Sequence, residues 1–546
     1  MRPLAPALAL LGGVALWATQ ASAPAPVAPG GNAAAFSTFF HARTAREAAA
    51  ASDQIVASGV GFDEAFGRLR QGRVYSRDVP RGVVQGSYRS ETGEYFYTFD
   101  VPERYDPARK YQVRVQLHGG VGRIEANTPP RSGSNGRLSG VEQIYVMPYA
   151  WRDAPWWTGR QVENLRAILD LVKRTYNVDE NRVVLSGVSD GGTGAYYTAM
   201  RETTPFASFL PLNGFIVVLK NETAEADGDL FPNNLLNKPL FIVNGGRDPM
   251  YPTSVVDPYV EHLKSHGVEL VYRPQPAAAH DTSWWPEIKD SFERFVADHP
   301  RVPLPDALSW ESGPPNIPSR AHWMVIDRLG AERDRGRDPG VNNAPSLPDA
   351  NRMSTRPALD FGLRASGTRI NRVVKGSNAE QIGLRSGDVV LTINNQPAFP
   401  GTDVAELLRG YPSGRALLFT VTRGGESVRP IRLSGRYAPT VLPGESDAMF
   451  PRQRESGRID LIRTGNRVDA RSRGVTAFTL LLSPDQFDLN RAITVVVNGR
   501  TVFDGIVQRD IRTLLKWAAR DNDRTMLFAA ELQVVVSLRP GSEQAQ

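Results

Sequence analysis

The chain has 546 residues, of which 41% are hydrophobic and 22% are charged. A single hydrophobic core does not organise a chain of this length, so roughly two to four domains are expected, and the composition excludes a disordered or fibrous protein. The formal net charge of +6 is spread among carboxylates without a long basic run, which argues against nucleic-acid binding. The sequence contains no cysteine, which excludes disulfides, a lipid-modified cysteine and cysteine catalysis.

The N-terminus has the pattern of a secretory signal peptide. Arg2 precedes an apolar stretch of about fifteen residues, and Ala21 and Ala23 fit the small-residue rule for cleavage. The stretch is short for a bilayer span, although an uncleaved anchor stays an alternative. We expect residues 1–23 to be a signal peptide, the mature protein to be secreted or periplasmic, and no stable membrane span to remain after cleavage.

After the N-terminus, the pattern of apolar residues is first that of helices and then that of alternating strands and helices. Residues 24–84 form an N-terminal helical appendage with many alanines. After it, strands such as 183–188 alternate with helical stretches, and the stretch 162–176 repeats apolar residues at three- and four-residue steps. The alternation over 85–300 predicts an α/β domain with a mostly parallel sheet and helices on both faces.

A serine flanked by glycines follows one of the buried strands. Gly187-Val188-Ser189-Asp190-Gly191 has the G-x-S-x-G pattern between a β-branched run and a helical stretch. A strand-to-helix turn of this kind strains the serine backbone, exposes its Oγ and leaves no room for a Cβ two residues before or after it. Ser189 is therefore the predicted nucleophile, and the N–H of Asp190 at the helix N-terminus is a predicted oxyanion donor.

A serine nucleophile needs a base and an orienting acid, and in this architecture the chain order is Ser, Asp, His. Asp248 and His280 each follow a predicted parallel strand, and sites on such sheets assemble at the carboxyl ends of strands. They are the predicted acid and base, with a turn role for Asp248 before Pro249 as the alternative. His262 and His266 are spaced i, i+4 without the glutamate of a metalloprotease motif, so no metal site is predicted.

A glycine pair follows another strand. Gly119 and Gly120 come directly after His118, and backbone N–H groups without side chains beside them can approach a substrate oxygen. We predict Gly120 and Asp190 as the oxyanion donors, with Gly119 as a further candidate. A plain tight turn is the alternative.

Five tryptophans follow the strand ends that carry the predicted site. Aromatic walls suit an apolar, aromatic or sugar-like group, and core packing explains the same residues equally well. The candidates for substrate binding are Trp151, Trp156, Trp157, Trp284 and Trp285.

The region around these residues resembles the α/β-hydrolase fold family. Within it the likeness is to secreted esterases of the polyhydroxybutyrate-depolymerase and feruloyl-esterase type, and more loosely to prolyl-oligopeptidase catalytic domains. The resemblance covers roughly residues 85–300, implies serine acyl hydrolysis without a cofactor, and maps Ser189, Asp248 and His280 onto the triad. The chain departs from those esterases in its lack of cysteine and in its long tail. The stretches that carry the likeness are YDPARKYQVRVQLHGG, YNVDENRVVLSGVSDGG and HDTSWW.

The tail is expected to hold an accessory β-rich domain with an inserted module. Residues 301–357 are assigned to an accessory β segment and linker, 358–436 to the insertion, and 437–546 to the rest of the β-rich domain. Within the last part, Asn498-Gly499 between β-branched runs predicts a hairpin.

The insertion resembles a PDZ domain over residues 369–395. A strand, a short helix ending in Gly383-Leu384 and the turn Ser386-Gly387-Asp388 carry the likeness. It implies binding of a peptide C-terminus by strand addition, and a structural module without a ligand is the alternative. The residues that would form the carboxylate loop are Phe361, Gly362, Leu363 and Arg364.

These observations together predict a secreted serine hydrolase without cofactor or metal that cleaves small esters. Two alternatives stay open: a serine peptidase of prolyl-oligopeptidase type, and a non-catalytic PDZ binding protein.

Overall fold

The computed structural model describes most of the chain. It covers residues 31–536 apart from 91–92, 125–136, 221–223, 225, 227, 229, 314–318, 331–339, 346–361, 374, 376, 395, 399–403, 405–407, 409–416, 425, 428–430, 434–445 and 451–455. The predicted signal peptide lies outside the described residues. Among the helices that are described, none combines the length and the hydrophobicity that a membrane span requires.

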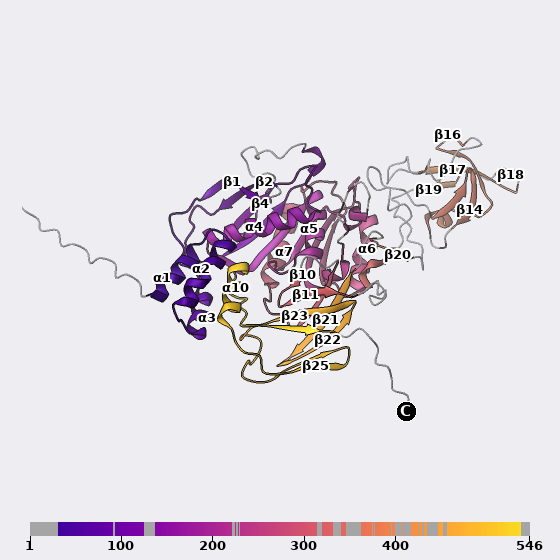
Figure 1. Ribbon diagram of the computed structural model, residues 1–546. Helices are drawn as coiled ribbons and strands as arrows, with labels where there is room; N and C mark the ends of the chain where they lie inside the picture. Colours follow the sequence, from indigo (N-terminus) through magenta and orange to yellow (C-terminus); the bar gives the residue numbers. More distant parts are fainter. Residues whose placement is uncertain are drawn as a thin grey trace, which may run out of the picture.

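The centre of the molecule is an eight-stranded sheet (Figure 1) in the order β1-β2-β4-β3-β5-β6-β7-β8. Strands β3 to β8 run parallel, whereas β1 and β2 pair antiparallel at one edge. This mostly parallel sheet confirms the predicted α/β fold class. The strands are β1 (Gly82–Ser90), β2 (Gly93–Val101), β3 (Tyr111–Leu117), β4 (Ile144–Pro148), β5 (Val178–Val188), β6 (Phe209–Leu212), β7 (Leu240–Gly245) and β8 (Leu270–Gln275).

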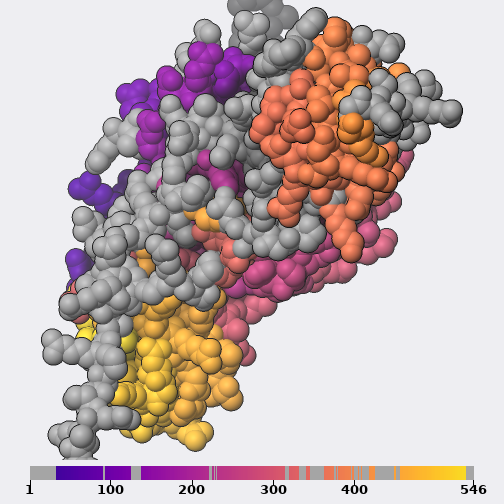
Figure 2. Space-filling model, turned by 90° about the vertical axis from the view of Figure 1, so that its right-hand side faces the viewer, coloured from indigo at the N-terminus to yellow at the C-terminus, as the bar shows by residue number. Residues whose placement is uncertain are grey.

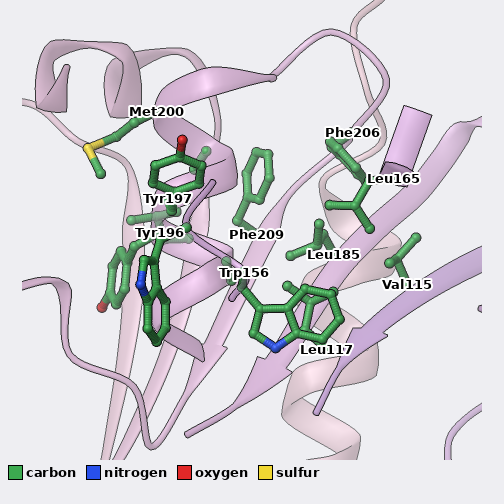
Figure 3. Packing of buried hydrophobic residues seen from close by; sticks show 14 of the residues in the cluster. Val115, Leu117, Trp156, Leu165, Leu185, Tyr196, Tyr197, Met200, Phe206 and Phe209 are labelled. Carbon is green, nitrogen blue, oxygen red and sulfur yellow. The ribbon is translucent and has the colours of Figure 1, made fainter. Parts of the chain in front are cut away.

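Helices cover both faces of this sheet because neighbouring strand residues point to opposite sides. On β5, Val183 and Leu185 join the core beneath α4 (Gly159–Thr175), α5 (Asp190–Arg201) and α6 (Thr253–Ser265). Val184, between them, joins the core beneath α7 (Trp285–Asp298) on the other face. Figure 3 shows the first of these cores, in which Leu117 of β3 lies beside Trp156, and Tyr196 and Tyr197 of α5 belong to the same cluster.

A second body of β-strands follows the sheet in the sequence. A five-stranded sheet, β25-β24-β22-β21-β9, and a four-stranded sheet, β10-β11-β23-β26, enclose one hydrophobic core. The turn between β24 and β25 is the predicted Asn498-Gly499 hairpin: both residues have positive φ, 50° and 79°, and Val497 pairs with Arg500. The strands are β9 (Ala307–Ser312), β10 (Ser319–Ala321), β11 (Met324–Leu329), β21 (Gly457–Thr464), β22 (Arg467–Arg473), β23 (Val475–Leu482), β24 (Ile493–Val497), β25 (Arg500–Gly505) and β26 (Ala530–Val535).

The two ends of the described chain meet in a helical cluster. The N-terminal helices α1 (Gly31–His41), α2 (Ala45–Ala57) and α3 (Phe62–Gln71) share a core with α10 (Ile511–Asp521). Buried Ile55 and Leu69 lie in this core with Leu514 and Leu515. The N-terminal helices are thus packed against the C-terminal part of the chain.

The segment that resembles a PDZ domain, called here the PDZ unit, has its own sheet in the order β13-β14-β15-β17-β18, and its own core. The turn predicted at Ser386-Gly387-Asp388 has Gly387 at a φ of 94°, and Asp388 binds Arg423 with two hydrogen bonds of 2.7 Å. In Figure 2 the orange residues of this unit form a body distinct from the yellow C-terminal strands. Its elements are β13 (Leu363–Ser366), β14 (Arg369–Val373), α8 (Asn378–Gln381), β15 (Val389–Ile393), β16 (Gln396–Pro397), β17 (Leu417–Arg423), β18 (Glu426–Ser427) and β19 (Ile431–Leu433).

A short ribbon lies at the base of this unit. The strands β12 (Asn343–Pro345) and β20 (Ser446–Ala448), one on each side of the PDZ segment in sequence, pair antiparallel. Together with residues 340–342 and 449–450 we call this ribbon the stem. Its residues Val341, Ala344, Met449 and Phe450 are buried in the same core as α4, α5 and α6.

Candidate active site

Ser189 occupies the sharp turn between β5 and α5. Its φ of 60° and ψ of −120° are a strained conformation for a residue with a side chain. The flanking glycines are a steric requirement: a Cβ on Gly187 would lie 2.0 Å from the carbonyl oxygen of Gly191, and a Cβ on Gly191 would lie 2.2 Å from the carbonyl oxygen of Leu117. The glycines therefore permit a turn that exposes the serine hydroxyl at the carboxyl end of β5.

The structure brings the predicted base and acid to this serine. His280 Nε2 lies 2.8 Å from Ser189 Oγ, and His280 Nδ1 lies 2.6 Å from Asp248 Oδ2. Because a carboxylate only accepts hydrogen bonds, Nδ1 carries the imidazole proton and Nε2 is the acceptor for the serine hydroxyl. The three side chains come from the ends of β5, β7 and β8, as the sequence analysis expects.

The acid is buried, whereas the serine and the histidine are partly exposed. The Asp248 side chain is 0% exposed and that of His280 is 20% exposed. The second oxygen of Asp248 accepts the N–H groups of Met250 at 2.7 Å and Tyr251 at 3.0 Å. The ring of Tyr251 meets that of His280 edge-on, with centroids 5.7 Å apart. These contacts orient the carboxylate and restrict rotation of the imidazole.

The predicted glycine pair lies directly against the serine. A Cβ on Gly119 would be 2.8 Å from Ser189 Cβ, and Gly120 adopts a φ of 68°. The next N–H, of Val121, donates to Asp190 Oδ2 at 2.8 Å, which ties this loop to the first turn of α5. The Asp190 N–H belongs to that same turn, where the helix offers no acceptor. The arrangement allows backbone donors from two elements to converge beside Ser189.

His118 supports this loop. Its Nε2 accepts the N–H of Ala150 at 3.1 Å, its Nδ1 contacts the carbonyl of Gly119 at 2.9 Å, and its own carbonyl accepts Trp156 Nε1 at 2.8 Å. Burial lowers the pKa of His118, which favours the neutral imidazole that this bonding pattern requires. His118 is thus a structural residue of the loop.

Four of the five candidate tryptophans lie in the core. Trp156 and Trp157 belong to the cluster beneath α4 and α5, and Trp284 and Trp285 belong to the cluster beneath α7. All four are at most 8% exposed. Figure 3 shows Trp156 beside Leu117. These four rings pack in the interior, in agreement with the core-packing alternative that the sequence left open. Trp151 alone of the five is partly exposed.

The side chain of Asp190 is a site feature that sequence analysis missed. Only its N–H was predicted to act, yet its carboxylate also holds the glycine loop through Val121. The two residues are 69 positions apart, so no local pattern points to the contact. The role of Tyr251 was missed for a different reason, since an aromatic residue after a strand end gives no sign of packing on a histidine.

The candidate peptide site of the PDZ unit is only partly within the described residues. Phe361 lies outside them, whereas Gly362 has a φ of 69° and Leu363 and Arg364 begin β13. β13 is the outermost strand in the order of the described PDZ sheet, so one of its edges faces no other described strand of that sheet. An edge of this kind can accept an added strand.

The described residues hold no cluster of three or more metal-ligating side chains. His262 and His266 pack with ring centroids 4.2 Å apart, and His262 Nε2 contacts the carbonyl of Val341 in the stem at 2.9 Å. His262 therefore joins α6 to the stem.

Comparison with known proteins identifies one part of the chain. Residues 369–423 match the family model of the PDZ domain. The chain contains a PDZ domain. The match agrees with the sheet and the glycine turn described above.

Two curated relatives are both named "Probable periplasmic serine endoprotease DegP-like". The protein from Marinomonas sp. (strain MWYL1) is 24% identical over 36% of this chain, and the protein from Ectopseudomonas mendocina (strain ymp) is 27% identical over 32% of it. The chain spans 38% and 35% of the lengths of these two relatives.

Solved structures similar to this chain include hydrolases. One is S-formylglutathione hydrolase (FrmB) from Staphylococcus aureus, at 17% identity over 40% of this chain and 98% of that one, with a TM-score of 0.31. Another is acylaminoacyl peptidase from Pyrococcus horikoshii, at 15% identity over 41% of this chain and 42% of that one, with a TM-score of 0.33. A ferulic acid esterase matches at 18% identity over 40% of this chain and 98% of its own length, with a TM-score of 0.30.

Proposed function

We propose that this chain is a serine hydrolase that cleaves carboxylic esters, with Ser189 as nucleophile, His280 as base and Asp248 as orienting acid. The observation that carries the proposal is that His280 contacts both other side chains at once, at 2.8 and 2.6 Å. A base at this distance can take the hydroxyl proton while the carboxylate stabilises the imidazolium that forms. The strained serine turn and the glycines beside it support the same assignment.

The reaction that these groups support has two halves. Ser189 Oγ attacks the ester carbonyl carbon while His280 takes the hydroxyl proton, and the carbonyl oxygen becomes an oxyanion. The N–H groups of Asp190 and of Gly120 or Gly119 are the donors that we assign to it. The C–O bond to the alcohol then breaks, and His280 returns its proton to the leaving oxygen. Water attacks the acyl-enzyme in the same way and releases the acid and the free serine.

A serine peptidase is the second candidate, and the PDZ domain is the observation that favours it. Domains of this type bind peptide C-termini by strand addition, and the edge of β13 that faces no other described strand of its sheet is suited to such binding. A peptide bound at this edge would be held by the same chain that carries Ser189. The signal peptide predicted from the sequence supports a secreted or periplasmic location for either activity.

A fluorophosphonate probe tests the proposal without knowledge of the substrate. We expect the probe to label the wild-type protein at Ser189 and to fail on Ser189→Ala, with circular dichroism unchanged. Ser283→Ala is the matched control, because this exposed serine follows His280 closely and should leave labelling intact. Labelling that persists in Ser189→Ala, or wild-type protein that is never labelled, contradicts the proposal. The second outcome would favour a non-catalytic PDZ binding protein.

A further inference from the structure

Asn213 lies at the end of β6, between the serine turn and the histidine loop. It is fully buried, and its φ of 47° is in the left-handed region. The preceding residue, Leu212, accepts the N–H of Ser189 through its carbonyl at 2.9 Å. The side-chain Nδ2 of Asn213 donates to the carbonyl of Asp281, the residue after His280, at 2.7 Å. Two adjacent residues, Leu212 and Asn213, therefore bond to the chain on the two sides of the serine–histidine contact.

The backbone of this segment is fixed to the elements around it. The N–H of Asn213 donates to the carbonyl of Val243 on β7 at 2.7 Å. Asn244 Nδ2 donates to the carbonyl of Gly214 at 3.1 Å. A Cβ on Gly214 would lie 2.5 Å from the backbone carbonyl carbon of Gly192, so the segment also abuts the first turn of α5. The amide of Asn213 thus projects from a rigid base that also locates the serine.

The histidine loop is held from its other side by the loop of the acid. The N–H of Arg247 donates to the carbonyl of Ala278 at 2.9 Å, and a Cβ on Gly245 would lie 2.5 Å from the carbonyl of Ala279. These contacts hold the residues before His280. The bond from Asn213 holds the residue after it, so the loop is anchored on both sides of the imidazole.

The backbone conformation at position 213 does not by itself explain why the residue is asparagine and not glycine. Glycine adopts a positive φ more readily than asparagine does. Asparagine also leaves its Oδ1 buried without a hydrogen-bond partner among the described residues, which is unfavourable. The feature that asparagine adds and glycine lacks is the N–H donor aimed at the carbonyl of Asp281.

We propose that Asn213 is a positioning residue for the base. Its amide fixes the backbone just after His280 and so keeps His280 Nε2 within reach of Ser189 Oγ. The inference rests on the proposed serine hydrolysis and adds to it a residue that contacts none of the reacting atoms.

Two substitutions separate this role from simple packing. Asn213→Gly keeps the backbone conformation but removes the donor, and we expect kcat to fall about 10- to 100-fold with KM nearly unchanged, because a displaced base slows the reaction without touching bound substrate. Asn213→Asp keeps the volume of the side chain but places a carboxylate oxygen against the carbonyl of Asp281. Its kcat should therefore fall at least as much as that of Asn213→Gly. A residue that only fills space predicts the reverse order, with the aspartate variant the more active.

The control is an asparagine of similar geometry far from the serine. Asn522 ends α10 with a φ of 45°, and its Nδ2 donates to Asp170 Oδ1 at 3.0 Å. Asn522→Gly should lower the melting temperature and leave kcat unchanged.

The readouts are kcat and KM on a small ester, the rate of fluorophosphonate labelling and the melting temperature. Labelling of Asn213→Gly at the wild-type rate would overturn this inference while leaving the proposed function intact. Absence of labelling in the wild type would instead contradict the proposed function itself.

Discussion

Gly119 is the residue whose side chain would most directly disturb the serine. A Cβ there would lie 2.8 Å from Ser189 Cβ and 3.0 Å from the carbonyl oxygen of Val188. Since that carbonyl belongs to the strained turn, neither partner can move without displacing the hydroxyl. Any side chain at this position therefore has to shift the glycine loop, and with it the donors assigned to the oxyanion.

We accordingly expect Gly119→Ala to lower kcat by about 10² or more, the size of effect that loss of one oxyanion donor has. Gly122→Ala is the matched control, because a Cβ there meets nothing within 4 Å and its φ is not positive. The measurement is kcat and KM on a small ester for both variants. Equal activity of the two variants would exclude the loop from the oxyanion site.

Asp248 is expected to act through the imidazole that it orients. For Asp248→Asn we expect kcat to fall by roughly 10⁴ with little change in KM, because the amide favours the wrong tautomer of His280. Asp257→Asn serves as the control: Asp257 accepts a hydrogen bond of 2.7 Å from the hydroxyl of Tyr272 and should be dispensable for turnover. If the Asp248 variant kept near-wild-type kcat, the orienting acid would have to be sought elsewhere.

Some residues of the candidate site can be predicted from a local sequence pattern, and others cannot. Ser189, Asp248 and His280 could be predicted because each follows a strand, and strand ends converge on parallel sheets. The Asp190–Val121 bond joins distant segments, so periodicity carries no information about it. The sequence could not decide between a substrate wall and core packing for the tryptophans, because an aromatic residue after a strand gives the same pattern in both cases. Trp156 lies in the core.

At the scale of elements, the stem joins the PDZ domain to the body built on the eight-stranded sheet. His262 on α6 contacts the carbonyl of Val341, and Lys220 Nζ donates to the carbonyl of Ala448 at 3.2 Å. Strands of three residues such as β12 and β20 have no detectable periodicity, so their pairing could not be predicted from the sequence. The PDZ fold itself could be predicted because its turn glycines and strand follow one another within a short stretch.

Two deletions test what the stem does. Replacing residues 358–436 by a short linker keeps the stem, and we expect hydrolysis of small esters to stay largely intact. Replacing 340–450 also removes Val341, Met449 and Phe450 from the core beneath α6, which should destabilise the protein by roughly 5 kcal/mol. Melting temperature and kcat should therefore separate the two deletions. Loss of small-ester activity in a folded 358–436 deletion would mean that the PDZ domain shapes the site.

At the scale of the whole molecule, buried ion pairs join the body built on the eight-stranded sheet to the C-terminal segment. Asp523 Oδ2 lies 2.7 Å from Arg301 Nη2 and 3.8 Å from Lys173 Nζ, and the side chains of Asp523 and Arg301 are 1% and 0% exposed. Beside them Arg524 binds Glu180, which is also buried. Figure 1 shows α10, which precedes these residues, against the N-terminal helices at the same end of the molecule. The sequence analysis predicted the helical appendage at the N-terminus but assigned residues 437–546 to a β-rich domain and did not predict α10. It could not identify what covers the appendage, because helical periodicity marks an apolar face and not its partner.

Replacing Asp523 should therefore lower the free energy of unfolding of the protein and leave the serine site unchanged. Asp523→Asn leaves Arg301 and Lys173 buried without their counter-charge, a change that typically costs about 3–5 kcal/mol. Asp485→Asn is the control, because Asp485 pairs with Arg70 at the surface with a side chain 39% exposed, and such pairs contribute at most about 1 kcal/mol. Urea unfolding at pH 7 should show a much lower midpoint for the Asp523 variant only.

The acid dependence of the same variant gives a sharper test. Burial alone would raise the pKa of Asp523, but Arg301 and Lys173, with hydrogen bonds from Thr525, hold it below the ordinary value. A carboxyl whose folded pKa is depressed contributes stability above its unfolded pKa of about 4, and this contribution is lost as the pH falls toward the folded pKa. The difference in urea midpoint between the wild type and Asp523→Asn should therefore shrink as the pH falls from about 5 to about 2. A difference in urea midpoint that stays constant over that range would mean that packing, and not the charge of Asp523, holds the two parts together.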